Sequence, residues 1–238
     1  MIVATNVSKH FGRFAALDNV SITCSKGQTI SLIGPNGSGK TTLIKCLLGM
    51  VVPDKGFITF NEKNILHDWK YRAQIGYMPQ TGKFPDNMRI SEVLDMMIDI
   101  RRRDQAQRDE ELMEAFGLGK IMDKRMRTLS GGTRQKVSAS LAFMFNPDVL
   151  ILDEPTAGLD PLSSEILKNK IRREKEKGKL ILVTSHILSD LDDITSEVVY
   201  LQEGKLLFHK SIHALRTDTG EEKLGRAIAS VMQKNMKQ

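Results

Sequence analysis

The segment GPNGSGKTT, residues 34–42, constrains the fold of this chain more than any other feature. It fits the pattern G-x-x-x-x-G-K-[ST] and lies between an apolar run, QTISLIG, and a helical segment, KTTLIKCLLG. Glycines in such a turn let backbone N–H groups point inward around a phosphate, and the start of the following helix adds its positive end. The segment therefore predicts a phosphate cradle in which Lys40 reaches the terminal phosphates and Thr41 binds Mg²⁺. The residues expected to hold the nucleotide here are Gly34, Asn36, Gly37, Ser38, Gly39, Lys40, Thr41 and Thr42.

The order of apolar patterns predicts an α/β fold. Short strand-like runs fill the first sixty residues, helical spacing dominates residues 84–145, and continuous apolar strands return with VLILDEP and LILVTSH. A helix is expected between these two strands, at about 161–177, and another after LILVTSH. Continuous apolar strands separated by helices indicate a parallel sheet covered on both faces. EVVYLQEGKLLF is expected to form a hairpin turning at Glu203 and Gly204.

These patterns predict a P-loop NTPase core with a mostly parallel sheet, a small antiparallel β subdomain and an inserted α-helical subdomain. The expected domain is residues 1–215, with the core and the β subdomain at 1–83 and 146–215 and the helical subdomain at 84–145. Residues 216–238 form a helical tail, because apolar residues recur there at helical spacing from Leu224 to Met232.

Acidic residues at the end of the strand VLILDE supply the second part of a nucleotide hydrolysis site. Ligands gather at the carboxyl ends of strands in open α/β sheets, so Asp153 is placed to hold Mg²⁺ and Glu154 to activate water. The same pair alone could be a turn or a helix cap. Gln80 and His186 also follow buried strands, and we expect the first to contact the metal and the second to bind a γ-phosphate oxygen. We therefore predict Glu154, His186, Lys40 and Gln80 as catalytic residues, and Thr41, Gln80 and Asp153 as metal ligands.

Phe11 is the candidate for stacking on the adenine ring of ATP. Packing in the core is the alternative role for this side chain, and Phe14 is a competing candidate for the stacking role.

The stretch LSGGTRQKV provides half of a second phosphate site. Ser130, Gly131 and Gly132 open a helix and can offer N–H donors and a positive dipole end to an anion. The stretch has no P-loop lysine and no metal ligand, so it can complete a phosphate site but not build one.

Six motifs in order make the chain resemble the nucleotide-binding subunit of an ATP-binding cassette (ABC) transporter over about residues 2–210. They are GPNGSGKTT, Gln80, LSGGTRQKV, VLILDEP, AGLD and His186. The resemblance implies ATP and Mg²⁺ as cofactors, and a homodimer or paired cassette in which LSGG of one subunit faces the P-loop of the other across ATP. It also implies that Asp160 contacts the partner's P-loop region and that Phe11 occupies the adenine-stacking position. Thr133 departs from the family, where glutamine commonly follows LSGG, but its hydroxyl can still bond near the helix start.

The resemblance further implies an integral-membrane permease as partner, with this chain peripheral on the cytoplasmic face of the inner membrane. The short tail and AGLDP resemble export-type or membrane-remodelling cassettes. YRAQIGYMPQTGKFPDNMRISEVL resembles the ATPase of the machinery that matures the copper enzyme nitrous oxide reductase. Six methionines between Gln80 and Arg134 could suggest copper ligands, but methionine at helical spacing is more often core or partner surface.

A soluble ABC ATPase acting on ribosomes or nucleic acid is the alternative function. The net charge of +6 could favour it, but the basic clusters are interleaved with acids, as on a solvated helix face, and no nucleic-acid partner is expected. No apolar run is long enough to span a membrane, which is consistent with a permease supplied by a separate chain. The two cysteines, Cys24 and Cys46, are expected to be small buried hydrophobes in a reducing compartment.

Overall fold

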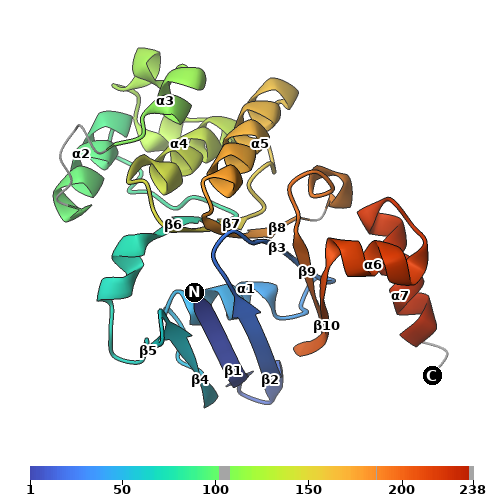
Figure 1. Cartoon of the computed structure of the whole chain (residues 1–238). Helices are drawn as coiled ribbons and strands as arrows, with labels where there is room; N and C mark the ends of the chain where they lie inside the picture. Colours follow the sequence, from blue (N-terminus) through green and yellow to red (C-terminus); the bar gives the residue numbers. More distant parts are fainter. Residues whose placement is uncertain (102–107, 186, 236–238) are drawn as a thin grey trace. The chain divides into compact units, whose positions relative to one another are not determined.

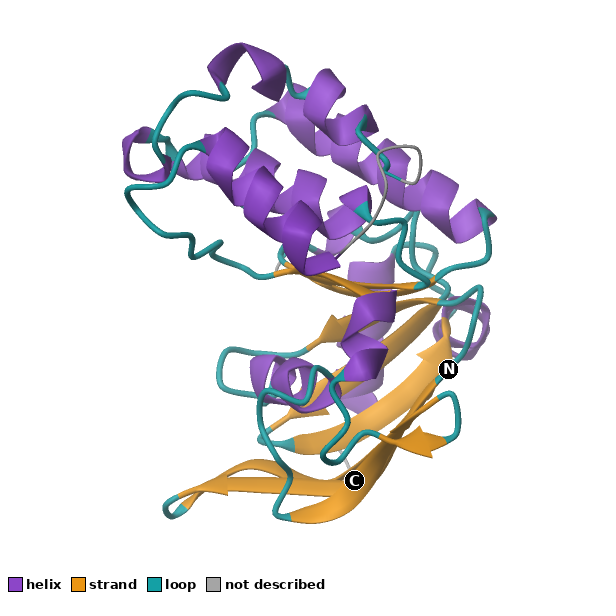
Figure 2. Cartoon of the chain, turned by 90° about the vertical axis from the view of Figure 1, so that its left-hand side faces the viewer, coloured by secondary structure: helices purple, strands orange, loops and turns teal. Residues whose placement is uncertain are grey.

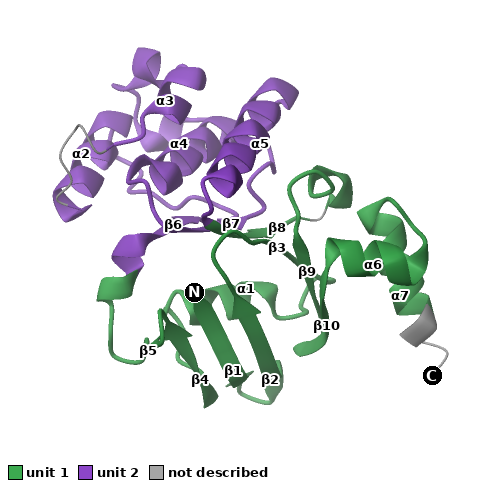
Figure 3. Cartoon of the chain, in the orientation of Figure 1, with its two compact units in different colours: residues 1–71, 180–238 green, residues 72–179 purple. Residues whose placement is uncertain are grey.

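The chain forms two compact units in this computed structural model, which describes residues 1–101, 108–185 and 187–235. Unit 1 comprises Met1–Tyr71 and Leu180–Gln238, and unit 2 comprises Arg72–Lys179 (Figure 3). Most of the strands belong to unit 1, whereas helices make up most of unit 2 (Figure 2). The predicted helical segment 84–145 falls wholly inside unit 2, and its boundaries as a separate subdomain stay a prediction.

An antiparallel sheet in unit 1 has the strand order β2-β1-β4-β5. Its strands are β1 (Ile2–Phe11), β2 (Phe14–Cys24), β4 (Lys55–Phe60) and β5 (Lys63–Asn64). Alternate residues such as Ile2 and Ala4 are buried, because the two-residue period of a strand sends every second side chain to the core. The sheet packs on α1 (Lys40–Leu47), which follows the P-loop (Figure 1).

The second group of strands in unit 1 is mainly parallel. The strand β3 (Thr29–Ile33) pairs in parallel with β8 (Leu180–Thr184) and β9 (Glu197–Gln202). Every residue of β3 and β8 is buried, as expected for strands covered on both faces. The predicted hairpin is confirmed, because β9 turns at Glu203 and Gly204, both with positive φ, into antiparallel β10 (Lys205–Ser211).

The segment after β8 does not form the predicted helix. Among the described residues between β8 and β9, the helical structure is limited to a short 3-10 helix, η5 (Leu188–Asp190). Side chains bond to nearby backbone there: the Ser185 hydroxyl accepts from Ile187 N, and the Thr195 hydroxyl donates to Leu191 O. Such local bonds compete with the helical ladder, and the apolar spacing alone gave no sign of them.

Two helices close unit 1, α6 (Ile212–Thr219) and α7 (Leu224–Asn235). The apolar stripe predicted in the tail is confirmed as a packing face, since Leu224, Ala227 and Ile228 are buried. The helix α6 was not predicted, although Ser211 caps its start by accepting a hydrogen bond from Ala214 N. No helix among the described residues is long and apolar enough to cross a membrane.

Unit 2 combines a parallel strand pair with a cluster of helices. The strands β6 (Ile75–Met78) and β7 (Val149–Asp153) pair in parallel. The helices that accompany them are η1 (Lys70–Gln74, at the unit boundary), α2 (Ile90–Arg101), α3 (Glu111–Ala115), η3 (Leu118–Ile121), η4 (Met126–Thr128), α4 (Gly131–Met144) and α5 (Pro161–Glu176). The predicted helices α5 and α4 are confirmed.

Methionines and cysteines serve the core of these units. Met126 belongs to the buried cluster of unit 2, and four more methionines pack against it: Met88, Met97, Met113 and Met122. Cys24 and Cys46 are buried in unit 1, and burial raises the pKa of Cys24 to about 12 and that of Cys46 to about 11. Both thiols therefore stay protonated and behave as the small hydrophobes expected from the sequence.

A buried lysine connects α5 to the segment that begins α3. Lys170 is 1% exposed, and its ammonium pairs with Asp109, with Glu111 at 2.9 Å and with Glu174 at 3.3 Å. Burial alone would raise the pKa of Glu174, but hydrogen bonds from Lys177 and Lys179 outweigh this effect and lower the pKa to about 2. The Glu174 carboxylate is therefore ionised near neutral pH.

Replacing Lys170 by alanine should lower the free energy of unfolding by about 3 to 5 kcal/mol, because it removes the buried cation that Asp109, Glu111 and the buried Glu174 share. Urea unfolding of the full chain measures this. Arg172→Ala is the matched control, since it removes a surface ion pair with Glu165 on the same helix and should cost about 1 kcal/mol or less. Equal losses in the two variants would contradict the role given to Lys170.

Candidate functional site

The P-loop of unit 1 runs from the end of β3 to the start of α1. Gly34 and Gly39 have positive φ, and a Cβ at either position would collide with backbone, at Leu201 O and Ala16 O respectively. The loop can approach these carbonyls only because both residues are glycine. Gly37 also has positive φ and faces open space. The glycines predicted from the motif are therefore required by this backbone.

The polar groups of the loop fit a phosphate ligand. The Lys40 ammonium donates to Gly34 O at 2.7 Å and to Pro35 O at 3.0 Å, so it lies against the loop itself. The Ser38 hydroxyl is buried and has no hydrogen-bond partner among the described residues. A buried hydroxyl without a hydrogen bond costs free energy unless a ligand provides that bond. Thr41 is exposed at the start of α1, where its hydroxyl can reach a metal ion.

The β9–β10 turn holds the P-loop in place. Gly204 N donates to Ser38 O at 3.1 Å, and Asp18 N donates to Gly204 O at 2.8 Å. The turn thus joins the cradle to β2 by backbone hydrogen bonds. The sequence predicted the turn but not its contact with the P-loop.

Two phenylalanines stand at the tip of the β1–β2 hairpin. Phe11 and Phe14 are register partners and are 53% and 59% exposed. The exposure rules out packing in the core for both. The Lys9 ammonium lies 5.7 Å from the centroid of the Phe11 ring. Further along the same strand as Phe14, Ala16 O approaches Gly39, so the hairpin tip belongs to the surroundings of the P-loop.

Phe11→Ala should weaken ATP binding by about 1 to 3 kcal/mol, the loss typical of removing one stacking aromatic, with little change in kcat. Binding of a fluorescent ATP analogue to the purified chain measures the change. Phe14→Ala is the matched comparison across the hairpin. A loss confined to Phe14→Ala would transfer the stacking role to that residue.

In unit 2 the polar residues Gln80, Asp153 and Glu154 stand at the carboxyl ends of two neighbouring parallel strands. Met78 pairs with Leu152, so Asp153, the last residue of β7, and Gln80, two residues beyond β6, lie at the same edge. Asp153 is buried and Gln80 is exposed. Burial, with a smaller contribution from the nearby Asp153 carboxylate, raises the pKa of Tyr77 to about 12. The structure therefore brings together the two predicted metal ligands of this unit.

Glu154 has an unusual backbone conformation. Its φ is 52°, in the left-handed region that non-glycine residues rarely adopt, and its carbonyl accepts a hydrogen bond from Gln135 Nε2 at 3.4 Å. Strain of this kind is found where a side chain must be aimed at a ligand. Gln135 is a residue of α4 that the motif analysis did not select.

The start of α4 carries the signature residues. The Ser130 hydroxyl caps the helix by accepting from Thr133 N at 3.1 Å, and the two hydroxyls lie 2.8 Å apart. The expectation that Thr133 would bond near the helix start is confirmed. Gly131 is exposed, with open space at its Cβ position, whereas a Cβ at Gly132 would lie 2.6 Å from Gly158 O. Only Gly131 can accept a side chain without moving the AGLD segment.

Asp160 caps α5 and joins it to the signature helix. Its carboxylate accepts from Ser163 N at 2.9 Å, from the Ser163 hydroxyl at 2.7 Å and from Lys136 Nζ at 2.9 Å. The hydrogen bond from Lys136, followed by those from Ser163, holds the pKa of Asp160 far below its usual range. The motif analysis missed Lys136, since no local pattern relates it to Asp160. The expected contact between Asp160 and a partner subunit stays a prediction.

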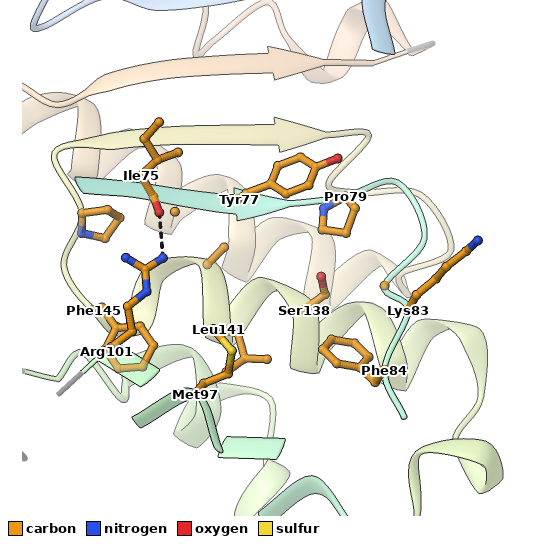
Figure 4. A pocket seen from close by; sticks show the side chains of 14 residues that line it. Ile75, Tyr77, Pro79, Lys83, Phe84, Met97, Arg101, Ser138, Leu141 and Phe145 are labelled. Atoms are coloured by element: carbon orange, nitrogen blue, oxygen red, sulfur yellow. Dashed lines mark hydrogen bonds between the residues drawn. The ribbon is translucent and has the colours of Figure 1, made fainter. Parts of the chain in front are cut away.

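A cavity of about 240 Å³ lies beside the segment that carries Gln80 (Figure 4). Its lining is largely apolar and comes from β6, the loop after Gln80, α2 and α4; the side chains that Figure 4 labels include Tyr77, Pro79, Phe84, Met97, Leu141 and Phe145. Arg101 donates to Ile75 O at 3.1 Å and lies 5.6 Å from the Phe145 ring centroid. Lys83 and Arg101 give the cavity positive charge.

The predicted site residues divide between the two units. Unit 1 holds Phe11 and the P-loop residues, with Asn36 exposed and Thr42 half-buried. Unit 2 holds Gln80, Asp153, Glu154, Ser130, Gly131, Gly132 and Asp160. The predicted γ-phosphate ligand His186 lies outside the described residues.

A P-loop between a buried parallel strand and a helix defines a nucleotide-binding protein of the P-loop NTPase fold. Residues 17–157 match the family described as ABC transporter. The chain belongs to this family and is one of its ATP-binding cassettes, a class of ATPase. It is 31% identical to the lipopolysaccharide export system ATP-binding protein LptB of Escherichia coli K12, over 87% of this chain and 89% of that one.

Two further comparisons agree with the family. The chain is 31% identical to the Nod factor export ATP-binding protein I of Ralstonia nicotianae; the match covers 88% of this chain but only 66% of that protein. A solved structure of an ATP-binding subunit of an ABC transporter superposes with a TM-score of 0.90 at 27% identity, covering 98% of this chain and 99% of that one.

Proposed function

We propose that this chain hydrolyses ATP as a dimer that encloses two ATP molecules and powers a separate integral-membrane permease. The observation that carries the proposal is the start of α4. Ser130 and Gly131 are exposed there and can offer backbone donors to an anion. The chain's P-loop already supplies one complete cradle, so this second, incomplete one suits the ATP of another subunit.

The roles of the remaining residues follow from their chemistry. Lys40 and the Ser38 hydroxyl bind phosphate oxygens, and Phe11 stacks on adenine. Mg²⁺, held by Thr41, Asp153 and Gln80, would neutralise charge on the phosphates. Glu154 orients water and takes its proton, while His186 holds the terminal phosphate.

ATP binding can supply the free energy that closes the dimer. At about 100 times the dissociation constant, a ligand that binds only the closed state contributes about 2.7 kcal/mol, so two contribute about 5 kcal/mol. This amount moves a two-state equilibrium from mostly open to mostly closed. Loss of the γ-phosphate removes the group that both subunits grip, and the dimer opens.

An export-type or membrane-remodelling permease is the partner that the relatives favour. Both relatives named above have export in their names, and LptB matches this chain over most of its length. The narrower role in nitrous oxide reductase maturation rests only on the stretch around Gln80, and five of the six methionines that suggested copper pack in the core of unit 2. Transport places the chain on the cytoplasmic face of the inner membrane, through its permease.

The cavity beside Gln80 is the docking surface we assign to the permease. Apolar side chains line it and Lys83 stands at its edge, which suits a short amphipathic segment of the partner with an acidic residue. Movement of the Gln80 segment on hydrolysis would then be transmitted to the permease through this contact.

Co-purification from detergent-solubilised membranes tests the proposed partner. We expect the tagged chain to retain an integral-membrane protein, and Phe84→Asp, which places a charge in the cavity, to lose it while ATP binding is kept. Recovery of ribosomes or nucleic acid without a membrane protein would favour the soluble alternative and overturn the assignment to a transporter.

A further inference from the structure

The C-terminal helix α7 contacts the segment that immediately follows His186. The first N–H of α7, at Leu224, donates to the Asp192 carboxylate at 2.8 Å. The helix packs on η5, and a Cβ built at Gly225 would lie 3.5 Å from Leu188 Cδ1. Asp192 thus accepts from a free N–H at the start of a helix that begins 32 residues later in the chain, as an N-cap side chain would.

The turn 187–195 has side-chain hydrogen bonds at both of its ends. The Thr195 hydroxyl lies 2.6 Å from the Ser31 hydroxyl in β3, the strand that leads into the P-loop. At the other end of the turn, the Ser185 hydroxyl accepts from Ile187 N at 2.9 Å and donates to Ile187 O at 3.1 Å. Ser185 and Ile187 are the two neighbours of His186 in the chain.

Packing favours a firm connection between α7 and this turn. Leu224, Ala227 and Ile228 of the helix are buried, as are Leu191 and Ile194 of the turn. The turn has no regular helix of its own beyond the short η5, so contacts with its neighbours determine its conformation.

We propose that α7 braces the turn 187–195, and that Asp192 is the positioning residue through which the tail sets the conformation of this turn, which directly follows the predicted γ-phosphate ligand in the chain. The inference rests on the proposed ATPase function. The expected effect is on the rate of hydrolysis, because the turn directly follows the predicted γ-phosphate ligand. ATP binding should change little, because the β9–β10 turn holds the P-loop backbone at Ser38.

Asp192→Ala in the full chain tests the proposal. We expect kcat for ATP hydrolysis to fall roughly threefold to tenfold, the range for loss of one N-cap, while KM and the affinity for ATP change less than twofold. Asp192→Asn should keep at least half of kcat, since asparagine retains an acceptor for Leu224 N. Asp218→Ala is the matched control: it removes the ion pair with Lys210 at α6 and should leave kcat unchanged.

A suppressor separates an effect through α7 from a direct effect on the nucleotide. A Cβ at Gly225 would lie 3.5 Å from Leu188 Cδ1, an ordinary contact, and alanine favours the helix over glycine. Gly225→Ala should therefore restore at least half of the kcat lost in Asp192→Ala. Unchanged kcat in Asp192→Ala, an equal loss of ATP affinity, or no recovery in the double variant would each overturn the proposal.

Hydrogen exchange without nucleotide gives a reading independent of turnover. Amides of residues 188–195 should exchange at least threefold faster in Asp192→Ala than in the wild type, and Gly225→Ala alone should not accelerate them. Unchanged exchange would refute the brace. If the wild-type chain hydrolyses no ATP while the exchange result holds, the proposed function fails and the brace remains.

Discussion

Glu154→Gln lowers the kcat of ATP hydrolysis by about 10² to 10⁴, the contribution of a general base. The change removes a carboxylate but keeps the size of the side chain. It leaves untouched the backbone carbonyl of Glu154, which accepts a hydrogen bond from Gln135. Glutamate and glutamine at this position must adopt the same left-handed φ. ATP binding should therefore stay within about twofold of the wild type. Phosphate release in steady state measures kcat, and a binding titration measures affinity.

Glu165→Gln is the control for the loss of one acidic charge. Glu165 pairs with Arg172 on the surface of α5, and its replacement should not alter kcat. Turnover by Glu154→Gln within threefold of the wild type would show that another group activates the water.

Gly131→Asp should abolish hydrolysis by preventing the dimer from closing on ATP. The added carboxylate meets open space within its own chain, and aspartate is favourable in the first turn of a helix, so the subunit should fold and bind ATP normally. In the closed dimer it would face phosphate oxygens, and like charges about 4 Å apart repel by roughly 4 kcal/mol near a protein surface. That energy corresponds to about a thousandfold weaker closure.

Gly131→Asn separates charge from size, because it adds a side chain of the same shape without the negative charge. It should keep at least a third of wild-type kcat. The comparison cannot be made at Gly132, where any side chain displaces the Gly158 carbonyl. Equal loss in the aspartate and asparagine variants would mean that bulk, and not repulsion by phosphate, inactivates the signature.

Mixing two inactive variants tests whether each ATP site is formed by the P-loop of one subunit and the signature of the other. A Lys40→Ala chain keeps its signature, and a Gly131→Asp chain keeps its P-loop. Their mixed dimer contains one composite site built from intact halves. We expect hydrolysis to return in the mixture, and its absence would weigh against sites shared between subunits.

Residues close in sequence carried most of what could be predicted. The P-loop glycines, the β9–β10 hairpin and the cap at Ser130 each follow from a local pattern that requires a particular backbone, and the structure contains all three. The helix expected after β8 was wrong because Ser185 and Thr195 bond to the backbone around them, and periodicity does not record such bonds.

Contacts between distant segments could not be predicted. Asp192 meets the start of α7, Lys136 meets Asp160, and Lys170 meets Asp109, and none of these pairs has a characteristic spacing. The difference between Gly131 and Gly132 is of the same kind, since it depends on where the Gly158 carbonyl lies. The motif alone therefore does not show which of its two adjacent glycines can accept a side chain.

Sedimentation of the Glu154→Gln chain with saturating ATP and Mg²⁺ tests the shared-site account most directly. The account predicts a species of twice the subunit mass that contains two ATP, and its disappearance when Gly131→Asp is added to the same chain. A chain that binds ATP fully and stays a monomer under these conditions would contradict it.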